Sequence, residues 1–186
     1  MWWWCERDGP ATARGSADRH CFHGQVTTSP MVWRVRRALA NWVADERPAR
    51  VGLFVDGPNV FRSEFDVDLD DLRAAGRSRG ELAVARLYLN EHATPGLIQA
   101  AEAHGFEVVL TSGDVDVKLA IDATELALSG DLDVLAVVSR DTDFKPVLEK
   151  AARHGVRTLA VSPGEHGRSD ALFSTAHETL HLDGDV

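Results

Sequence analysis

The sequence predicts an α/β protein of three layers, with helices on both faces of a central, mainly parallel sheet of about five strands. From Arg50 onward, short and almost continuously apolar segments alternate with segments of helical periodicity. Strands covered on both faces have such apolar runs, whereas a sheet with one solvated face shows alternating polarity. Glycine also follows two predicted helices, at Gly105 and Gly155, where a helix often ends in a left-handed residue.

The elements can be assigned in order along the chain. The predicted strands are VGLFV, LAVARLYL, FEVVL, DVLAVVS and VRTLAVS, at residues 51–55, 82–89, 106–110, 133–139 and 156–162. The predicted helices cover residues 68–76, 95–104, 116–129, 144–154 and 168–176. In the third of these helices we expect the apolar side chains to pack inward, namely Val117, Ala120, Ile121 and Leu128.

The N-terminal part differs from this pattern. Residues 1–30 combine three consecutive tryptophans with Gly, Pro, Ser and Thr, without periodicity, and are predicted to be disordered or to precede a true start at Met31. Residues 31–49 are predicted to form an amphipathic helix, with an apolar stripe of Met31, Val35, Leu39 and Trp42. The α/β domain is then predicted to occupy residues 50–186.

Length and composition indicate a soluble protein with one substantial core. The chain has 186 residues, of which 44% are hydrophobic and 26% charged. It contains no apolar stretch of the roughly 20 residues that span a bilayer and no signal-peptide pattern, so we expect a cytoplasmic protein without membrane contact. Cys5 and Cys21 both precede the domain, and their spacing with His20 and His23 matches no standard zinc finger.

The net charge of −9 has two interpretations. Three lysines against seventeen arginines, with abundant aspartate, resemble the composition of proteins from salt-loving microbes. In that interpretation the acidity keeps the surface hydrated and says little about the ligand. In the other interpretation it argues against nucleic acid, because phosphate groups normally bind a basic surface.

Polar residues follow three of the predicted strands. They are Asp56 and Asn59, then Asp114 and Asp116, then Asp141 and Asp143. The carboxyl ends of parallel strands meet at one edge of the sheet, where ligands bind in open α/β folds. A single aspartate there is explained as a helix cap, but four or more would repel one another unless a cation neutralised them. Carboxylates without His or Cys suit Mg²⁺ or Mn²⁺.

Helix geometry allows two positions for Asp122. It follows Asp116 by six residues, which is about 240° around an ideal helix. Both side chains can reach one site if Asp116 lies outside the regular helix. The alternative is that Asp122 faces solvent.

Three segments, VGLFVDGPNV, GDVDVKLAIDA and VVSRDTDFKPVLEKA, together resemble the NYN domain, a PIN-like ribonuclease domain that includes the LabA-like proteins. The resemblance runs from about Val51 to Leu182 and is greatest to an archaeal branch. It implies a PIN-like, Rossmann-like fold and a Mg²⁺- or Mn²⁺-dependent nuclease, in which metal-activated water hydrolyses phosphodiester bonds, usually in RNA.

The resemblance also implies roles for individual residues. The metal ligands would be Asp56, Asp116, Asp122, Asp141 and Asp143. Asn59 would belong to the catalytic group, orienting Asp56 or contacting substrate, while Ser139 and Arg140 would lie on the substrate side. Lys118 would contact the scissile phosphate. The sequence departs from the family pattern at Pro58 and at Arg140, where glycine is common, and neither change removes a ligand.

The predicted partners are RNA, including single-stranded RNA, and a second copy of the chain in a homodimer. The alternative is a non-catalytic module that binds RNA or a nucleotide on the same fold and acts with a partner. Other hydrolase classes are excluded by their motifs. Pro58 stands where a haloacid dehalogenase has its second aspartate, and the chain has neither GxxxxGK[ST] nor GxSxG.

Overall fold

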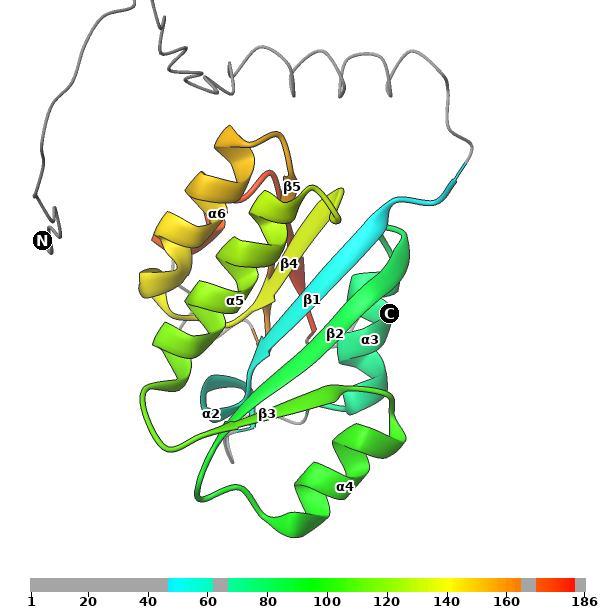
Figure 1. The fold of residues 1–186 in the computed structure, drawn as a ribbon, viewed down its shortest axis with the longest axis vertical. Helices are drawn as coiled ribbons and strands as arrows, with labels where there is room; N and C mark the ends of the chain where they lie inside the picture. Colours follow the sequence, from blue (N-terminus) through cyan, green and yellow to red (C-terminus); the bar gives the residue numbers. More distant parts are fainter. Residues whose placement is uncertain (1–46, 62–66, 165–169, 183–186) are drawn as a thin grey trace, which may run out of the picture. The chain divides into compact units, whose positions relative to one another are not determined.

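The computed structural model describes residues 47–61, 67–164 and 170–182 (Figure 1). In this part of the chain six strands form one sheet in the order β3-β2-β1-β4-β5-β6, and every neighbouring pair is parallel. The strands are β1 (Arg50–Asp56), β2 (Glu81–Asn90), β3 (Glu107–Thr111), β4 (Val134–Val138), β5 (Arg157–Ser162) and β6 (Glu178–His181). This is the strand order of doubly wound nucleotide-binding folds.

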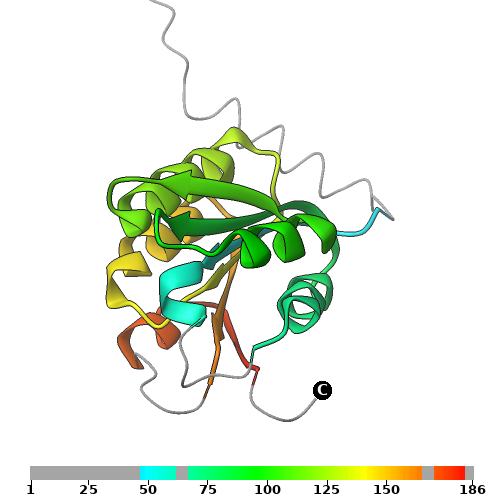
Figure 2. The same cartoon turned by 90° about the horizontal axis from the view of Figure 1, so that it is seen from below.

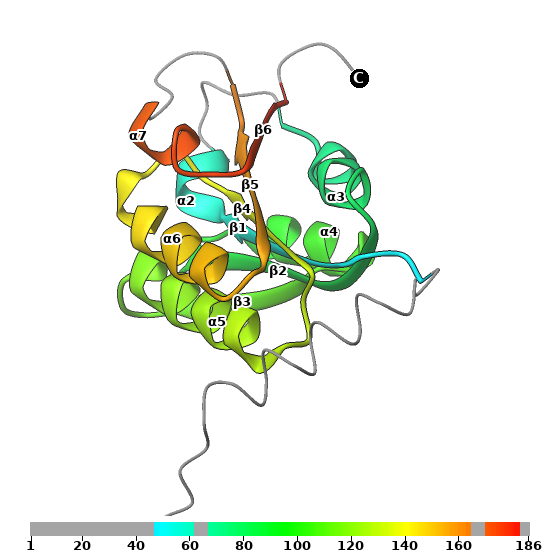
Figure 3. The same ribbon diagram turned by 90° about the horizontal axis from the view of Figure 1, so that it is seen from above.

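Helices cover both faces of the sheet, as Figures 2 and 3 show. They are α2 (Gly57–Val60), α3 (Leu69–Arg77), α4 (Pro95–Ala103), α5 (Val115–Ser129), the 3₁₀ turn η1 (Thr142–Phe144), α6 (Lys145–Arg153) and α7 (Asp170–Phe173). One apolar core lies between the sheet and α3 with α4, and a second lies between the sheet and α5, α6 and α7. The predicted three-layer α/β fold is therefore confirmed.

The predicted strands and the first four predicted helices are all present, with ends that differ from the prediction by no more than one residue. The short helices α2 and α7 depart from it. α2 was not predicted, and α7 is shorter than the predicted helix at 168–176, whose residues 168 and 169 lie outside the described residues. No helix in the described part of the chain is long and apolar enough to cross a membrane.

The sixth strand was also missed. β6 is four residues long and pairs with β5 alone, with Leu159 opposite Glu178 and Ser162 opposite His181. Its side chains are half-buried or exposed, because an edge strand is covered less than a central one. A short strand with so few apolar residues has no continuous hydrophobic run by which it could be recognised.

The predicted inward face of α5 is wrong. Val117 and Ile121 are each 56% exposed and Leu128 is 42% exposed, while Ala120 is partly buried. The buried residues of this helix are instead Val115, Leu119, Asp122, Ala123 and Ala127. Because α5 carries apolar side chains on both faces, hydrophobic periodicity could not decide which face is turned toward the sheet.

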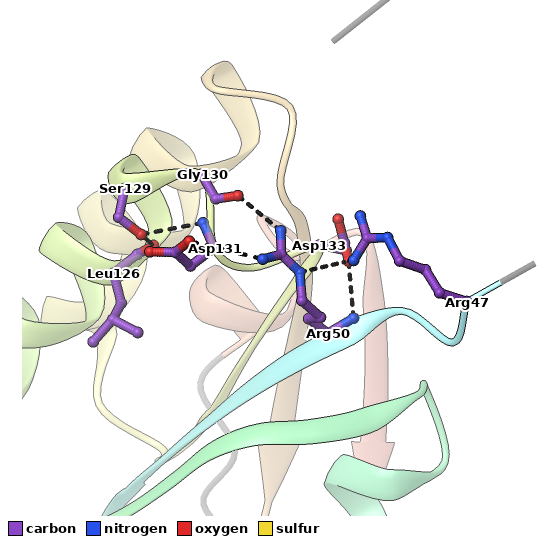
Figure 4. A network of polar contacts seen from close by, with 7 residues as sticks. All are labelled: Arg47, Arg50, Leu126, Ser129, Gly130, Asp131 and Asp133. Atoms are coloured by element: carbon purple, nitrogen blue, oxygen red, sulfur yellow. Dashed lines mark hydrogen bonds and ion pairs between the residues drawn. The ribbon is translucent and has the colours of Figure 1, made fainter. Parts of the chain in front are cut away.

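The start of β1 is tied to the connection between α5 and β4 (Figure 4). The backbone N–H of Arg50 donates to Asp133 Oδ2 at 2.9 Å, and its guanidinium donates to the carbonyl of Gly130 at 2.8 Å. Arg47 also pairs with Asp133, at 3.4 Å. Gly130 ends α5 in the left-handed conformation, with φ of 85°. These contacts hold the N-terminal end of β1 beside the start of β4.

The predictions for residues 1–30, and for most of the helix at 31–49, lie outside the described residues. Residues 47–49 are described and are not helical. Pro48 stands among them, and the residue before a proline is disfavoured in a helix.

Candidate metal centre

The carboxyl ends of β1 and β4 lie side by side, at the point where the chain changes direction across the sheet. After β1 the chain adds β2 and β3 on one side of β1, and it then returns to add β4, β5 and β6 on the other side. In folds of this topology the ligand binds at such a switch point. Asp56 ends β1, and Ser139 follows β4 directly.

Asp56 is fully buried and has two very different carboxylate oxygens. Its Oδ2 accepts hydrogen bonds from Asn59 Nδ2 at 2.6 Å and from Ser139 Oγ at 2.8 Å. Its Oδ1 is buried and has no hydrogen-bond partner among the described residues. Burial raises the pKa of Asp56 above its ordinary value, although the bonds from Asn59 and Ser139 favour the charged form.

The segment after Asp56 explains why Asn59 turns back toward it. A side chain at Gly57 would place its Cβ 2.4 Å from Leu89 Cδ2 and 2.6 Å from the Tyr88 carbonyl, so this position accepts glycine alone without rearrangement. Pro58 then stands in the first turn of α2, where its fixed φ suits a helix. The close packing of α2 on the end of β2 brings the Asn59 amide to Asp56.

Ser139 connects the ends of β1 and β4. It is fully buried, donates to Asp56, and accepts the backbone N–H of Asp141 at 3.1 Å. Asp141 in turn caps η1, since its Oδ1 accepts the N–H of Asp143 at 2.9 Å. Phe144 is completely buried below this turn. Asp141 is half-buried and Asp143 is exposed, so the two acids lie at different depths.

Asp116 faces the same cluster from the first turn of α5. Its pKa is raised to about 6, first by burial and then by the negative charges of four other carboxylates. In decreasing order of effect these are Asp56, Asp141, Asp114 and Asp143. The structure therefore brings together acids from the ends of β1, β3 and β4, the strands whose ends the sequence analysis singled out.

No three of these carboxylates bring their oxygens within 4.8 Å of one another. Among the described residues, the group of three ligand atoms that all lie within 4.8 Å of one another is Asp68, Asp70 and His104. That group lies at the start of α3 and the end of α4, and these two helices cover the face of the sheet opposite to α5. Asp68 caps α3 and His104 Nδ1 lies 2.8 Å from the Ala100 carbonyl, so each already has a structural role.

Asp122 belongs to a second polar group, on the other flank of α5. It is buried, and its Oδ2 accepts the Tyr88 hydroxyl at 3.0 Å while its Oδ1 accepts Lys118 Nζ at 2.7 Å. Arg86 NH1 is 3.8 Å from Oδ2. Asp122 therefore does not face solvent. Lys118 points along the helix toward Asp122, one turn further on and away from the start of α5, where Asp116 lies.

Tyr88 was missed by the sequence analysis. It lies directly opposite Asp56 on the neighbouring strand, and its ring stacks on Phe54. Burial raises its pKa, and the charge of Asp122 raises it further, so the hydroxyl remains a proton donor. The signal in the sequence was a pair of polar residues, Arg86 and Tyr88, in a strand that is otherwise apolar.

Comparison with known proteins supports both the fold and the motifs. The NYN domain family model matches residues 50–183. An uncharacterized protein of the archaeon Methanocaldococcus jannaschii is 42% identical over 162 residues, covering 84% of this chain and 67% of that protein. A crystal structure of a protein of unknown function from Vibrio parahaemolyticus shares the fold, with a TM-score of 0.65 and 23% identity over 74% of this chain and 95% of that one.

Proposed function

Because this chain belongs to the NYN domain family, whose members are generally nucleases, we propose that it is a metal-dependent nuclease that hydrolyses phosphodiester bonds in RNA. The observation that carries the proposal is the buried Oδ1 of Asp56, which has no hydrogen-bond partner among the described residues. It belongs to a group of carboxylates whose charges add to the effect of burial in raising the pKa of Asp116 to about 6. A buried oxygen of this kind is costly unless a cation or water satisfies it.

The donor set fits Mg²⁺ or Mn²⁺. All the candidate ligands are carboxylate oxygens, which hard divalent cations prefer. Mg²⁺ usually keeps several of its waters and binds through one or two carboxylates, so acids that are not within direct ligand distance of one another still suit it. Such an ion, when bound, supplies Lewis acidity that activates water and neutralises charge on the phosphate.

The protein side chains divide the remaining work. The side chains of Asn59 and Ser139 both donate to Oδ2 of Asp56 and so hold this carboxylate in place. Asp116 and Asp141 complete the inner group of acids, and the exposed Asp143 stands at its outer edge. We assign Arg140, which is half-buried between Ser139 and Asp141, to contacting a substrate phosphate.

Asp122 and Lys118 are assigned supporting roles. Both oxygens of Asp122 accept hydrogen bonds from the protein, so we assign it to holding Tyr88 and Lys118 rather than to binding metal. Lys118 is 47% exposed at its side chain, which leaves its two remaining N–H groups open to a partner outside the domain.

The test is cleavage of labelled single-stranded RNA by wild type, Asp141→Asn and Asp131→Asn, in high salt with Mn²⁺, Mg²⁺ or EDTA. Asp131 is the control, because it is an exposed acid at the opposite end of α5. We expect metal-dependent cleavage in wild type and Asp131→Asn and a loss of about 100-fold or more in Asp141→Asn. RNA binding without cleavage in all three proteins would contradict the proposal and favour a binding module.

A further inference from the structure

The outward face of α5 carries an apolar stripe. Val117, Ile121 and Leu128 are exposed although the opposite face of the helix is buried in the core. With the half-buried Thr124 they are spaced by four, three and four residues, which is the alternation of positions d and a in a coiled coil. A helix that is apolar on both faces is normally covered on both.

We propose that this stripe is a self-association surface, on which two copies of the chain pair through antiparallel α5 helices about a two-fold axis. If the axis passes between Ile121 and Thr124, Val117 of each copy faces Leu128 of the other. Ile121 then faces Thr124, and the same contacts are made twice. Such an interface is isologous, the commonest arrangement in homo-oligomers.

Charges beside the stripe select the antiparallel orientation. Lys118 and Glu125 each follow a stripe residue and lie on the same side of it, and both are exposed. In an antiparallel pair this side meets the same side of the second copy, so each Lys118 approaches a Glu125. In a parallel pair, the side with Lys118 and Glu125 would instead meet the opposite side of the stripe on the second copy. That side carries Ala120 and Ala127, which offer no charge. Lys118 already bonds Asp122 and has two further N–H donors.

The size of the stripe predicts a weak dimer. Four residues along one helix bury much less than the roughly 800 Å² per partner of a standard interface, and one of the four is a threonine. We therefore expect a dissociation constant on the order of 100 μM. Metal and RNA are not needed for this association.

The first test measures the mass of the full chain by sedimentation equilibrium from roughly 10 μM to 1 mM, with Cys5 and Cys21 changed to serine to exclude disulfides. The mass should rise from 20.3 kDa toward twice that value. Ile121→Lys should weaken association by about tenfold or more. The matched control is Leu110→Lys, because Leu110 is equally exposed, at 56%, but lies on β3; it should leave the association unchanged.

The second test determines the orientation. Val117→Cys and Leu128→Cys proteins, each in the serine background, are mixed and treated with a short bismaleimide. Mixed dimers should form in excess over dimers of either variant with itself. A predominance of the homotypic products would overturn the antiparallel arrangement.

A wild type that stays monomeric at the highest concentration would overturn the proposal itself. If Ile121→Lys then lowered the thermal stability of that monomer, the stripe would be assigned to contacts within one chain.

Discussion

Asp56→Asn should make the metal-free protein more stable while removing its response to metal. The substitution keeps an oxygen that can accept from Asn59 and Ser139, and it removes one charge from the acidic group. A pKa raised from 3.8 to about 6 at Asp116 corresponds to about 3 kcal/mol between the two protonation states. Burial is the largest cause, and Asp56 is the largest of four charged contributors, so we expect a gain of about 1 kcal/mol at pH 7.

The pH dependence has a definite sign. The pKa of Asp116 is higher in the folded protein than in the unfolded chain, so its ionisation disfavours the folded state. The penalty is absent below about pH 4, grows as pH rises toward 6, and is complete above that. Metal-free wild type should therefore lose stability between pH 4 and pH 7, and Asp56→Asn should lose less. The difference between the two proteins should nearly vanish at pH 4.

The assay is urea denaturation of wild type, Asp56→Asn and the control Asp131→Asn, with EDTA or with Mn²⁺. Mn²⁺ should stabilise wild type and Asp131→Asn, because a ligand that binds only the folded state raises the free energy of unfolding. It should have little effect on Asp56→Asn. The reasoning is refuted if Asp56→Asn is destabilised by about 2 kcal/mol or more in EDTA, or if Mn²⁺ stabilises all three proteins equally.

Three other predictions follow from the same structure. Affinity for Mn²⁺, measured by calorimetry, should rise by up to about tenfold per pH unit from pH 5 to 6 and level off above pH 6, because Asp116 must lose its proton before it can bind the metal. An affinity that does not change with pH would contradict a role for Asp116. Tyr88→Phe and Asp122→Asn should each lower the free energy of unfolding by about 1–2 kcal/mol, and the double variant should lose less than the sum because the two residues share one hydrogen bond. Affinity for Mn²⁺ should stay within about twofold in both variants. A tenfold loss of that affinity in Asp122→Asn would show that Asp122 is a metal ligand. Gly57→Ala should lower the free energy of unfolding by about 2 kcal/mol or more, measured by urea denaturation, because the added Cβ would clash with the Tyr88 carbonyl and Leu89. An unchanged denaturation midpoint would show that α2 can shift to make room.

The position of the acids was predictable because parallel topology alone determines it. Apolar runs located the strands, and in such a sheet the residues that follow the strands share one edge. Asp56, Asp116 and Asp141 could therefore be grouped from the sequence alone, and the structure brings them together. The family motif added Asn59 and Ser139, whose contacts with Asp56 are present.

The buried position of Asp122 and the exposure of Val117 and Ile121 could not be predicted, because they depend on which face of α5 is turned toward the sheet. Asp122 is turned inward because Tyr88, on a strand more than 30 residues earlier, offers a buried donor. No local pattern in the sequence records that pairing. With Asp122, Leu119 and Ala123 inside, Val117 and Ile121 are left outside, so the position of Asp122 and the exposure of these two residues reflect one orientation of the helix. The strand β6 was not predicted for a different reason, because a short edge strand needs few apolar residues and so has no recognisable hydrophobic run.

Asp116 is the acid on which the centre depends most. Asp56 has donors in Asn59 and Ser139, and Asp141 accepts a backbone N–H, so the protein itself offsets part of the cost of both charges. Among the described residues Asp116 has no such hydrogen-bond donor and gains only the favourable field at the start of α5. Burial and then the four neighbouring carboxylates raise its pKa to about 6, and no donor in the described part of the chain opposes them. A cation bound at this edge would thus relieve Asp116 more than any other acid, so the proton on Asp116 and the metal should compete directly.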